Sequence, residues 1–454
     1  MFRKIAILAT ALLTALPASA EEIHLKMWTL VDRDTPYREQ NIVDAAKVLN
    51  AEYKAAGIDK TIVIDVNRGN QKGWDAYALD MLKAFAVKQG PDIYTLPHEW
   101  IGKFAENGYA MNMEAAIAAR PWAFNDVLPN LWESVRASDG KIHGVPQDAE
   151  IRMFFYNKDM LRKIGKDEAF IDGLPAAVER GDFTLDDLTA LAKEVKDKGA
   201  AEYGMLHRPN VGIDYLMVFK SFGVKFVDPK TGKLMLPKKE MQNALAWYET
   251  NAKEGVTPID NTAMSWDAIK TAFKQEKAFI FHQGVWAVAW QTGDALGVSW
   301  PKDEAGYTHK IGWLPAPAAV KGGKPANLSH PIIYAINPGT KYPDVAADLV
   351  AIATTPYFNV RHAVISNHTA ITHAETALPA YKANWVVSLA SPMMEGADFV
   401  PNNPQFSDYN KVLFTGLQAV ETGKMTAAQA VGFIADELDL QLGDAVEIHD
   451  SAAE

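Results

Sequence analysis

The chain has 454 residues, a length typical of two or three domains, and its hydrophobic fraction of 48% is that of a globular protein with a large core. The absence of cysteine excludes disulfides, thiolate metal sites, a cysteine nucleophile and anchoring through a lipid-modified cysteine. With 56 acidic against 45 basic residues, the chain is poorly suited to binding nucleic acid or an anionic membrane surface. It also contains 12 tryptophans, an excess that requires an explanation.

The first twenty residues predict a secretory signal peptide. Arg3 and Lys4 form a positive region, residues 5–16 form an apolar run, and Ala18-Ser19-Ala20 predicts cleavage after Ala20. The apolar run is shorter than the roughly 20 residues of a membrane-spanning helix. Without Arg3 and Lys4, 43 basic residues face 56 acidic ones, a net charge of −13. We therefore expect residues 1–20 to be removed and the mature protein to be periplasmic, soluble and not lipid-anchored.

The mature chain opens with alternating strand and helix patterns. Residues 23–27 alternate apolar and polar side chains, as a strand does, and a polar turn follows. A second strand is expected at residues 61–66, a helix at 74–85 from apolar residues at helical spacing, and a strand at 92–96. This spacing indicates βαβ units and a parallel sheet.

Similar signals recur toward the C-terminus. Thr184 is expected to cap a helix that ends at Gly199, and Thr426 begins a capping-box pattern. Strands are predicted at residues 203–206 and 331–336, and the second of these leads through a turn into another helix. No repeat, low-complexity tract or long linker separates these segments, so two domains would be joined by several short crossings.

No catalytic motif occurs together with the motifs that must accompany it. Ser138-Asp139-Gly140-Lys141 matches S-x-x-K, but it lies in a polar turn without those motifs. The patterns of a nucleophile elbow, a phosphate loop and a dinucleotide-binding turn do not occur. His98-Glu99 begins the zinc pattern H-E-x-x-H, but Gly102 stands where the second histidine is required. We therefore expect no enzyme activity, no cofactor and no metal. A secreted glycan-degrading enzyme stays open as an alternative, because the separation of paired carboxylates is a tertiary quantity.

Several segments, in order along the chain, resemble the maltose-binding-protein-like family of bacterial extracellular solute-binding proteins. The stretch GKIHGVP at residues 140–146, followed by FFYNKDM at 154–160, is similar to the most recognisable pattern of that family. Glu276 and Phe279 depart from the pattern, which has glycine and a small residue there. The other matching segments are Gly90-Pro91-Asp92-Ile93-Tyr94, residues 108–112, residues 273–279 with 284–286, and Pro401-Asn402-Asn403-Pro404.

The resemblance implies an α/β fold of the type II periplasmic-binding-protein kind. Each of its two lobes would be a mixed, mostly parallel sheet flanked by helices, and the lobes would close on a ligand by hinge motion. By alignment, the chain crosses between lobes near Ala149, Ile311 and Ser366. The N-terminal lobe would comprise residues 21–149 plus 311–366, and the C-terminal lobe residues 150–310 plus 367–454.

The resemblance also implies a function. The protein would be a monomer that binds a carbohydrate, such as a mono-, di- or oligosaccharide, a glycoside or a polyol. It would deliver this ligand to the inner-membrane permease subunits of an ABC importer, whose ATPases are separate chains. The identity, length and linkage of the sugar do not follow from the sequence.

A sugar site needs carboxylates, amides and arginines for the hydroxyls, and aromatic rings for the sugar faces. Such groups are expected at strand ends, where open α/β sheets bind ligands. Candidates in the first part of the chain are Asp32, Arg33, His98, Glu99, Trp100, Asp148, Glu150 and Arg152. Candidates further along are His207, Arg208, Asn210, Asp214, Trp266, Trp286, Ser329, His330 and Tyr409.

Within this set the resemblance assigns particular roles. An acid and a base fall at Asp32 and Arg33, a ligand carboxylate at Glu150, a stacking ring at Trp286 and a second aromatic platform near Tyr409. Trp247 and Trp290, which lie in apolar helical stretches, are expected in the core. The basic candidates leave a second cargo open, namely an anionic sugar derivative or a glycerol phosphodiester; these are Arg33, Arg152, Arg208, His98, His207 and His330.

Overall fold

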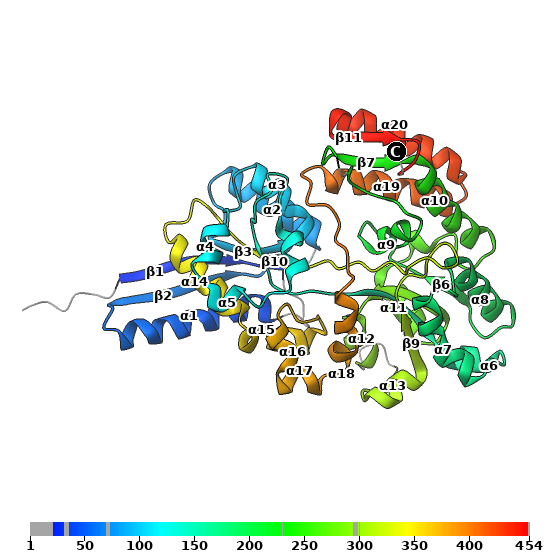
Figure 1. Ribbon diagram of the computed structural model, residues 1–454, viewed down its shortest axis with the longest axis horizontal. Coiled ribbons are helices and arrows are strands. Elements are labelled where there is room, and N and C mark those ends of the chain that lie inside the picture. The colour runs from blue at the N-terminus through cyan, green and yellow to red at the C-terminus, as the bar shows by residue number, and fades with distance from the viewer. Residues whose placement is uncertain are drawn as a thin grey trace, which may run out of the picture.

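A computed structural model of the chain describes residues 21–30, 36–69, 73–228, 230–293, 298 and 300–452. The signal peptide predicted at residues 1–20 lies outside this part. The described residues fold into two α/β lobes that lie side by side (Figure 1). Among these residues, no helix combines the length and the apolar character needed to cross a bilayer.

The first lobe is built on a five-stranded sheet in the order β2-β1-β3-β10-β4. Its strands are β1 (Glu21–Trp28), β2 (Lys60–Asn67), β3 (Ile93–Pro97), β10 (Ile332–Ile336) and β4 (Val145–Pro146). β1 pairs in parallel with β2 and β3, whereas β10 runs antiparallel to β3 and β4. The strands predicted at 23–27, 61–66, 92–96 and 331–336 are confirmed, and the sheet is mixed.

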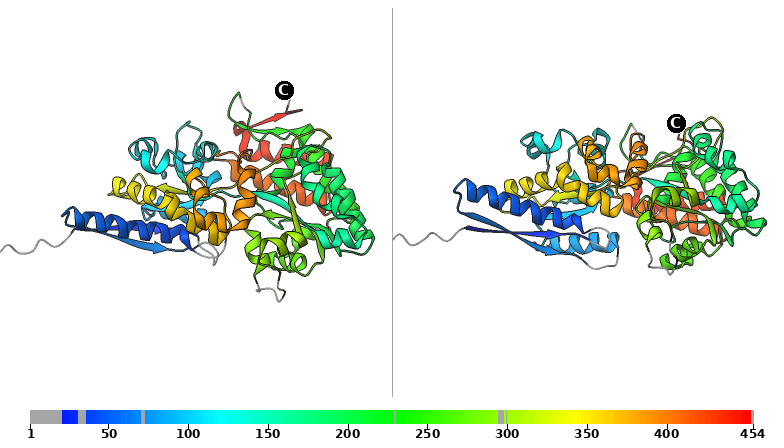
Figure 2. Two further views of the ribbon diagram at one scale, coloured as in Figure 1. Left: turned by 60° about the horizontal axis from the view of Figure 1, so that its bottom comes forward. Right: turned by 90° about the horizontal axis from the view of Figure 1, so that it is seen from below.

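Helices cover both faces of this sheet. α1 (Tyr37–Ala55) follows β1, and α2 (Trp74–Ala86) follows β2. The chain moves from β1 to β2 in one direction and from β2 past β1 to β3 in the other, so right-handed crossovers place the two helices on opposite faces, as Figure 2 shows. The other helices of this lobe are α3 (Ile101–Glu106), α4 (Glu114–Ala118), α5 (Pro121–Phe124), α14 (Pro343–Thr354), α15 (Pro356–Ser366), α16 (His373–Ala377) and α17 (Pro379–Ala383).

The second lobe contains a four-stranded sheet in the order β6-β8-β5-β9. Its strands are β6 (Tyr203–Leu206), β8 (Ala278–Gly284), β5 (Arg152–Asn157) and β9 (Ile311–Leu314). β5, the second-lobe strand that follows the first crossing, pairs antiparallel with β8 and β9. Every residue of β5 is buried, and its side chains alternate between two apolar clusters: Phe155 belongs to one, Phe154 and Tyr156 to the other.

Helices and a small sheet complete the second lobe. Thr184 and Thr426 form the N-terminal capping boxes of α8 (Leu185–Asp197) and α20 (Ala427–Leu442), as the sequence predicts. β7 (Leu234–Pro237) and β11 (Val446–His449) pair in parallel. The remaining helices are α6 (Lys158–Lys163), α7 (Glu168–Glu179), α9 (Asp214–Ser221), α10 (Lys238–Lys253), α11 (Trp266–Lys274), α12 (Ala287–Thr292), α13 (Glu304–Lys310) and α19 (Phe406–Glu421), with α18 (Trp385–Ala390) between the lobes.

Two segments pack on a different lobe from the one that the predicted division gives them. Residues 311–314 form β9, which pairs with β5 in the second sheet and so belongs with that lobe, beyond the crossing predicted near Ile311. α16 packs on the first lobe, because Thr372 bridges Val127 and the Ala374 amide donates to Asp126. Strand partners are tertiary information, which an alignment of weakly similar segments does not contain. The other predicted limits stay a prediction.

Candidate functional site

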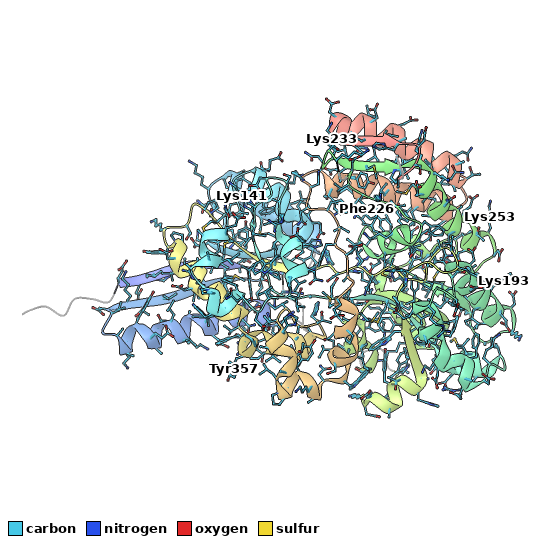
Figure 3. All side chains as sticks on the ribbon, viewed as in Figure 1. Lys141, Lys193, Phe226, Lys233, Lys253 and Tyr357 are labelled. Carbon is cyan, nitrogen blue, oxygen red and sulfur yellow. The ribbon has the colours of Figure 1, made fainter. Side chains whose placement is uncertain are left out.

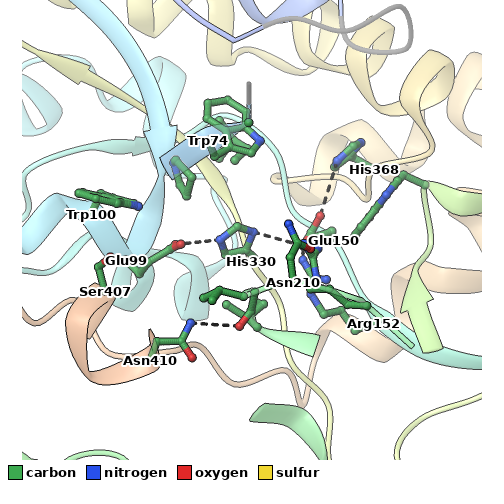
Figure 4. A pocket seen from close by; sticks show the side chains of 18 of the residues that line it. Trp74, Glu99, Trp100, Glu150, Arg152, Asn210, His330, His368, Ser407 and Asn410 are labelled. Carbon is green, nitrogen blue, oxygen red and sulfur yellow. Dashed lines mark hydrogen bonds and ion pairs between the residues drawn. The ribbon is translucent and has the colours of Figure 1, made fainter. Parts of the chain in front are cut away.

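A pocket of about 540 Å³ lies between the two lobes, lined by residues from both of them (Figure 4). Several of its residues sit at strand ends, as expected for open sheets. Glu99 follows β3 and His330 precedes β10 in the first lobe. Arg208 follows β6 and Trp286 follows β8 in the second lobe. Glu150 lies at the crossing into β5 and also lines the pocket.

The first side of the pocket carries a histidine between two carboxylates (Figure 4). The Nε2 atom of His330 lies 2.8 Å from Oε2 of Glu99, and its Nδ1 atom lies 3.5 Å from Oε1 of Glu150. Burial opposes protonation of His330, but the charges of Glu99 and Glu150 raise its pKa to about 9. Burial likewise opposes ionisation of Glu99, yet His330 lowers the pKa of that carboxyl to about 2. At neutral pH this side therefore presents fixed carboxylate oxygens.

The second side is anchored by a buried aspartate. Asp214, at the start of α9, accepts hydrogen bonds from the guanidinium groups of both Arg152 and Arg208. Burial raises the pKa of Asp214, but the two arginines together hold it well below its usual range. Arg152 also donates from its second terminal nitrogen to Oε1 of Glu150 at 2.5 Å, so it links the two sides.

Tryptophans account for much of the remaining lining. Trp74, Trp100, Trp266, Trp286 and Trp290 all face the pocket, five of the 12 in the chain, and this explains their excess. The Arg152 guanidinium lies 4.8 Å from the ring centre of Trp286, and that of Arg208 lies 5.0 Å from Trp266. The prediction that Trp290 belongs to the core is wrong, because the short helix α12 runs along the pocket and leaves its ring partly exposed there. The prediction for Trp247 is confirmed, since it is buried.

A second layer supports the pocket from behind. Asp148 is buried and accepts hydrogen bonds from the Ile332 amide and from Arg38, at 2.8 and 2.9 Å. His362 contacts the same carboxylate at 3.0 Å. Burial raises the pKa of Asp148, whereas the neighbouring cationic groups keep it well below its usual range. This layer holds Arg38 beside the pocket, where its guanidinium lies 5.3 Å from the Trp74 ring centre.

The structure brings nine of the predicted site residues to the pocket wall. These are Glu99, Trp100, Glu150, Arg152, Arg208, Asn210, Trp266, Trp286 and His330. Four more lie directly behind it, because each contacts a lining residue or a group that bonds one: His98, Asp148, Asp214 and Ser329. Asp32 and Arg33 lie outside the described residues. Whether any of these residues touches a ligand stays a prediction.

Two predicted residues do not reach the pocket. Tyr409 is fully buried in α19 and donates its hydroxyl to the Met235 carbonyl at 2.7 Å, so its ring packs in the core of the second lobe. His207 points from the end of β6 toward Glu421, 2.5 Å away. Burial lowers the pKa of His207, but Glu421 raises it, so the pair is a buried structural contact.

Sequence reasoning missed several lining residues, and four of them, Arg38, Trp74, His368 and Asn410, have positions that depend on tertiary structure. Arg38 and Trp74 begin α1 and α2, and helical spacing alone makes Trp74 look like core. His368 follows a left-handed Asn367 that ends α15, and its ring stacks on Trp286 with 5.8 Å between centres. Asn410 lies on α19, one residue after Tyr409. The four share no local sequence signal, since Trp74 fits an apolar helical pattern and Asn410 lies within α19.

The charges at the pocket are balanced. Each described cation that lines it has a carboxylate partner: Arg38 has Asp148, Arg152 and Arg208 share Asp214, and His330 has Glu99. The outer surface carries more exposed pairs, such as Lys193 with Asp197 and Lys253 with Glu249 at the far edge of the second lobe (Figure 3). The pocket thus offers many hydrogen-bonding groups with little net charge.

Comparison with known proteins identifies the family. A model of the bacterial extracellular solute-binding protein family matches residues 40–356, and the chain belongs to this family. A binding-protein relative from Brucella abortus (strain 2308) is 23% identical over 279 residues, which are 60% of this chain and 61% of the relative. The maltotriose-binding protein of Pyrococcus abyssi (strain GE5 / Orsay) is 24% identical over 291 residues, 63% of this chain and 53% of that protein. The matches thus span less than two thirds of both relatives.

Solved structures share the fold over nearly the whole chain. Maltose-bound MalE3 of T. maritima has a TM-score of 0.71 at 20% identity, covering 92% of this chain and 100% of that one. The sugar-binding protein MalE of Xanthomonas citri has a TM-score of 0.73 at 17% identity, with coverages of 92% and 97%. The GacH receptor of Streptomyces glaucescens GLA.O has a TM-score of 0.71 at 17% identity, with coverages of 93% and 99%. The two-lobed periplasmic-binding-protein fold expected from the sequence is confirmed.

Proposed function

We propose that this protein is the periplasmic substrate-binding component of an ABC importer and that its ligand is a carbohydrate. It would capture the ligand between its lobes and hand it to permease subunits whose ATPases are separate chains. The relatives are binding proteins, and two of the matched proteins are named for binding maltotriose or sugar. The observation that carries the proposal is the pocket itself, where five indole rings surround a set of paired charges.

The chemistry of this pocket suits a polyhydroxylated neutral molecule. Glu99 and Glu150 offer acceptor oxygens, while Asn210 and Arg152 offer donors from the other lobe. Indole faces complement the C–H groups of a pyranose ring. Because both lobes contribute groups, a ligand gains contacts on closure, and this differential affinity is what drives a two-state hinge.

Charge pairing argues against an anionic cargo. A sulfo- or phospho-ligand would need cations free to pair with it, but Arg152 and Arg208 already share Asp214. Recruiting either arginine would leave that buried aspartate short of a partner. The alternative of an anionic sugar derivative or glycerol phosphodiester is therefore less well supported than a neutral sugar. The hydrolase alternative gains no support from relatives that are binding proteins.

A thermal-shift screen of mono-, di- and oligosaccharides, polyols and sugar acids tests the proposal. A true ligand at a hundred times its dissociation constant should stabilise the folded protein by about 2.7 kcal/mol. Trp286→Ala should abolish most of this shift, whereas Trp122→Ala should not, because Trp122 is a surface residue with 61% of its area exposed. If no compound in the screen raises the melting temperature, the carbohydrate proposal is wrong.

Two further measurements separate the alternatives. Arg208→Gln should weaken an anionic ligand more than Trp286→Ala does, and a neutral sugar should show the reverse order. Turnover of chromogenic glycosides that is lost in Glu150→Gln would instead establish a hydrolase. A role in transport would be shown by a strain that lacks this protein and no longer takes up the identified sugar.

A further inference from the structure

Three side chains at the first side of the pocket place one potential metal-ligand atom each in a common space. His98 and Glu99 follow β3, and His330 precedes β10. Nδ1 of His98, a carboxylate oxygen of Glu99 and a ring nitrogen of His330 all lie within 4.8 Å of one another. Oε2 of Glu99 is 2.8 Å from Nε2 of His330 and 3.5 Å from Nδ1 of His98.

His98 is the unusual member, because one of its nitrogens has no explained role. Its side chain is fully buried, and Nε2 lies 3.3 Å from the Val400 carbonyl oxygen. A carbonyl can only accept, so Nε2 carries the proton; burial favours the neutral ring, which leaves a lone pair on Nδ1. Among the described residues, Nδ1 of His98 has no hydrogen-bond partner. Its lone pair faces the Glu99 carboxylate, an arrangement that is repulsive unless a cation lies between them.

We propose that His98, Glu99 and His330 bind a divalent transition-metal ion of the Zn²⁺ type at this side of the pocket. Two imidazoles and one carboxylate form the ligand set of many zinc sites that keep a position open. Ligands around a tetrahedral Zn²⁺ are separated by about 3.3 Å, given bonds of about 2.0–2.1 Å. The two separations from Glu99, 2.8 and 3.5 Å, are close to this value, and the two histidine nitrogens lie within 4.8 Å of each other.

The outer contacts of both histidines fit the same assignment. A metal-bound imidazole normally gives its other N–H to a carbonyl or carboxylate, which fixes the ring and its tautomer. His98 has the Val400 carbonyl in this place, and His330 has Oε1 of Glu150 at 3.5 Å from Nδ1. The ion would replace the proton that Glu99 and His330 share, so binding releases a proton.

The arrangement also accounts for an incomplete motif in the sequence. His98-Glu99 starts a zinc pattern whose second histidine is missing at Gly102. The fold brings His330 to Glu99 across a separation of 231 residues. Glu99 and His330 line the pocket while His98 lies behind them, so the open position of the ion faces the bound solute. The assignment holds whatever that solute is.

Two other clusters of potential ligands are less suitable. Asp148, His362 and His368 lie together, but the Arg38 guanidinium 2.9 Å from Asp148 supplies a fixed positive charge that opposes a second cation. Asp228, Glu447 and His449 form a more exposed group at the small β7–β11 sheet. That group serves as the internal control for surface binding.

Zn²⁺ titration of the chelator-treated, dialysed mature protein tests the proposal. Calorimetry with elemental analysis should give one tight Zn²⁺ per chain in the wild type and in His449→Gln. Glu99→Gln and His98→Gln should weaken binding at least tenfold. Co²⁺ in place of Zn²⁺ should give the strong visible absorption of a four-coordinate site in the wild type and lose it in Glu99→Gln.

Circular dichroism of each variant separates loss of metal from loss of fold. Glu99→Gln keeps the size of the side chain at the pocket wall. Its Zn²⁺ affinity therefore tests the proposal even if the buried His98→Gln variant unfolds. The proposal is overturned if wild type and Glu99→Gln bind Zn²⁺ equally, or if only His449→Gln loses it. A sugar-induced thermal shift that persists after chelation leaves the carbohydrate proposal standing, so the two proposals fail separately.

Discussion

The two sides of the pocket solve the same recognition problem with different chemistry. On the first side, His330 stands between Glu99 and Glu150, so polar atoms are held by charge pairing around one imidazole. On the second side, Asp214 fixes two arginines whose guanidinium groups lie near indole rings. One side therefore offers oxygen atoms to hydroxyls, and the other offers flat faces with donors at their edges.

The two sides also differ in which residues hold their polar groups in place. The polar groups of the first side are kept in place by neighbours that also line the pocket. The two arginines of the second side share one carboxylate, Asp214, that is itself buried behind the wall. A change on the first side should hence alter binding, whereas removal of Asp214 should damage the fold as well.

The largest effect is expected from Asp214→Asn. It removes the counter-charge that the buried Arg152 shares with the partly exposed Arg208, and breaking a buried pair costs about 3–5 kcal/mol. Because the folded pKa of Asp214 is depressed, its contribution is present above the unfolded pKa and is lost as pH falls. Urea unfolding at pH 7 should therefore show the full loss, and the gap to wild type should narrow in acid.

A matched control for this variant is Asp197→Asn, which breaks an exposed i,i+4 pair with Lys193. Surface pairs of this kind contribute less than about 1 kcal/mol. Equal destabilisation by the two variants would contradict the role assigned to Asp214.

Glu375 provides the contrasting case of a buried carboxyl outside the pocket. No described cation forms an ion pair with it, and burial raises its pKa to about 8. The Ile371 amide donates to the Glu375 carboxyl, and the Glu375 amide donates to the Thr372 hydroxyl. An acid with a raised folded pKa stabilises the protein less as pH rises from its unfolded pKa to about 8. Glu375→Gln should consequently be more stable than wild type at pH 7, by roughly 3 kcal/mol.

The measurement for Glu375 is the melting temperature of both proteins from pH 5 to pH 9. The difference should grow with pH and level off above pH 8. A constant difference over this range would show that Glu375 is already ionised in the folded protein.

A smaller effect is expected at the second side from Trp266→Ala. Loss of this ring removes a flat face and leaves the Arg208 guanidinium without the indole 5.0 Å away. Ligand affinity should fall about tenfold, equivalent to about 1.4 kcal/mol. Titration calorimetry with the ligand found in the screen measures it, and Trp122→Ala is the control on the surface. Unchanged affinity would assign stacking to other rings.

The smallest effect is expected far from both sides, at the cap of α20. Thr426→Ala removes the side-chain acceptor of the Gln429 amide and should cost about 1 kcal/mol of stability. Ligand affinity should stay the same, because Thr426 does not line the pocket. A change in affinity would mean that α20 communicates with the ligand site.

Local signals were enough to predict several elements of this fold. The alternation of residues 23–27 and the capping residues Thr184 and Thr426 act within a few residues of chain, so they can be read directly from the sequence. The strand predicted at 61–66 was found as β2, one residue longer at each end. The two-lobed arrangement followed from the family resemblance instead.

The pocket was only partly predictable, because its wall combines segments that no local pattern relates. Glu99, Glu150 and His330 could be suspected as polar residues at strand ends, and they do line it. Arg38 could not, since its place depends on Asp148 and on the packing of α1. The resemblance places an aromatic platform near Tyr409, but a shift of one residue along a helix decides whether a ring faces the pocket or the core.

The interior position of β10 in the first sheet has a consequence for how the protein is made. In the first sheet this strand separates β3 from β4, yet its residues come after the whole second sheet in the chain. Until the ribosome has synthesised about three quarters of the 454 residues, β3 keeps an unpaired edge and the sheet of the first lobe is incomplete. Such a delay keeps the nascent polypeptide unfolded for longer, and this would suit the export proposed for this protein.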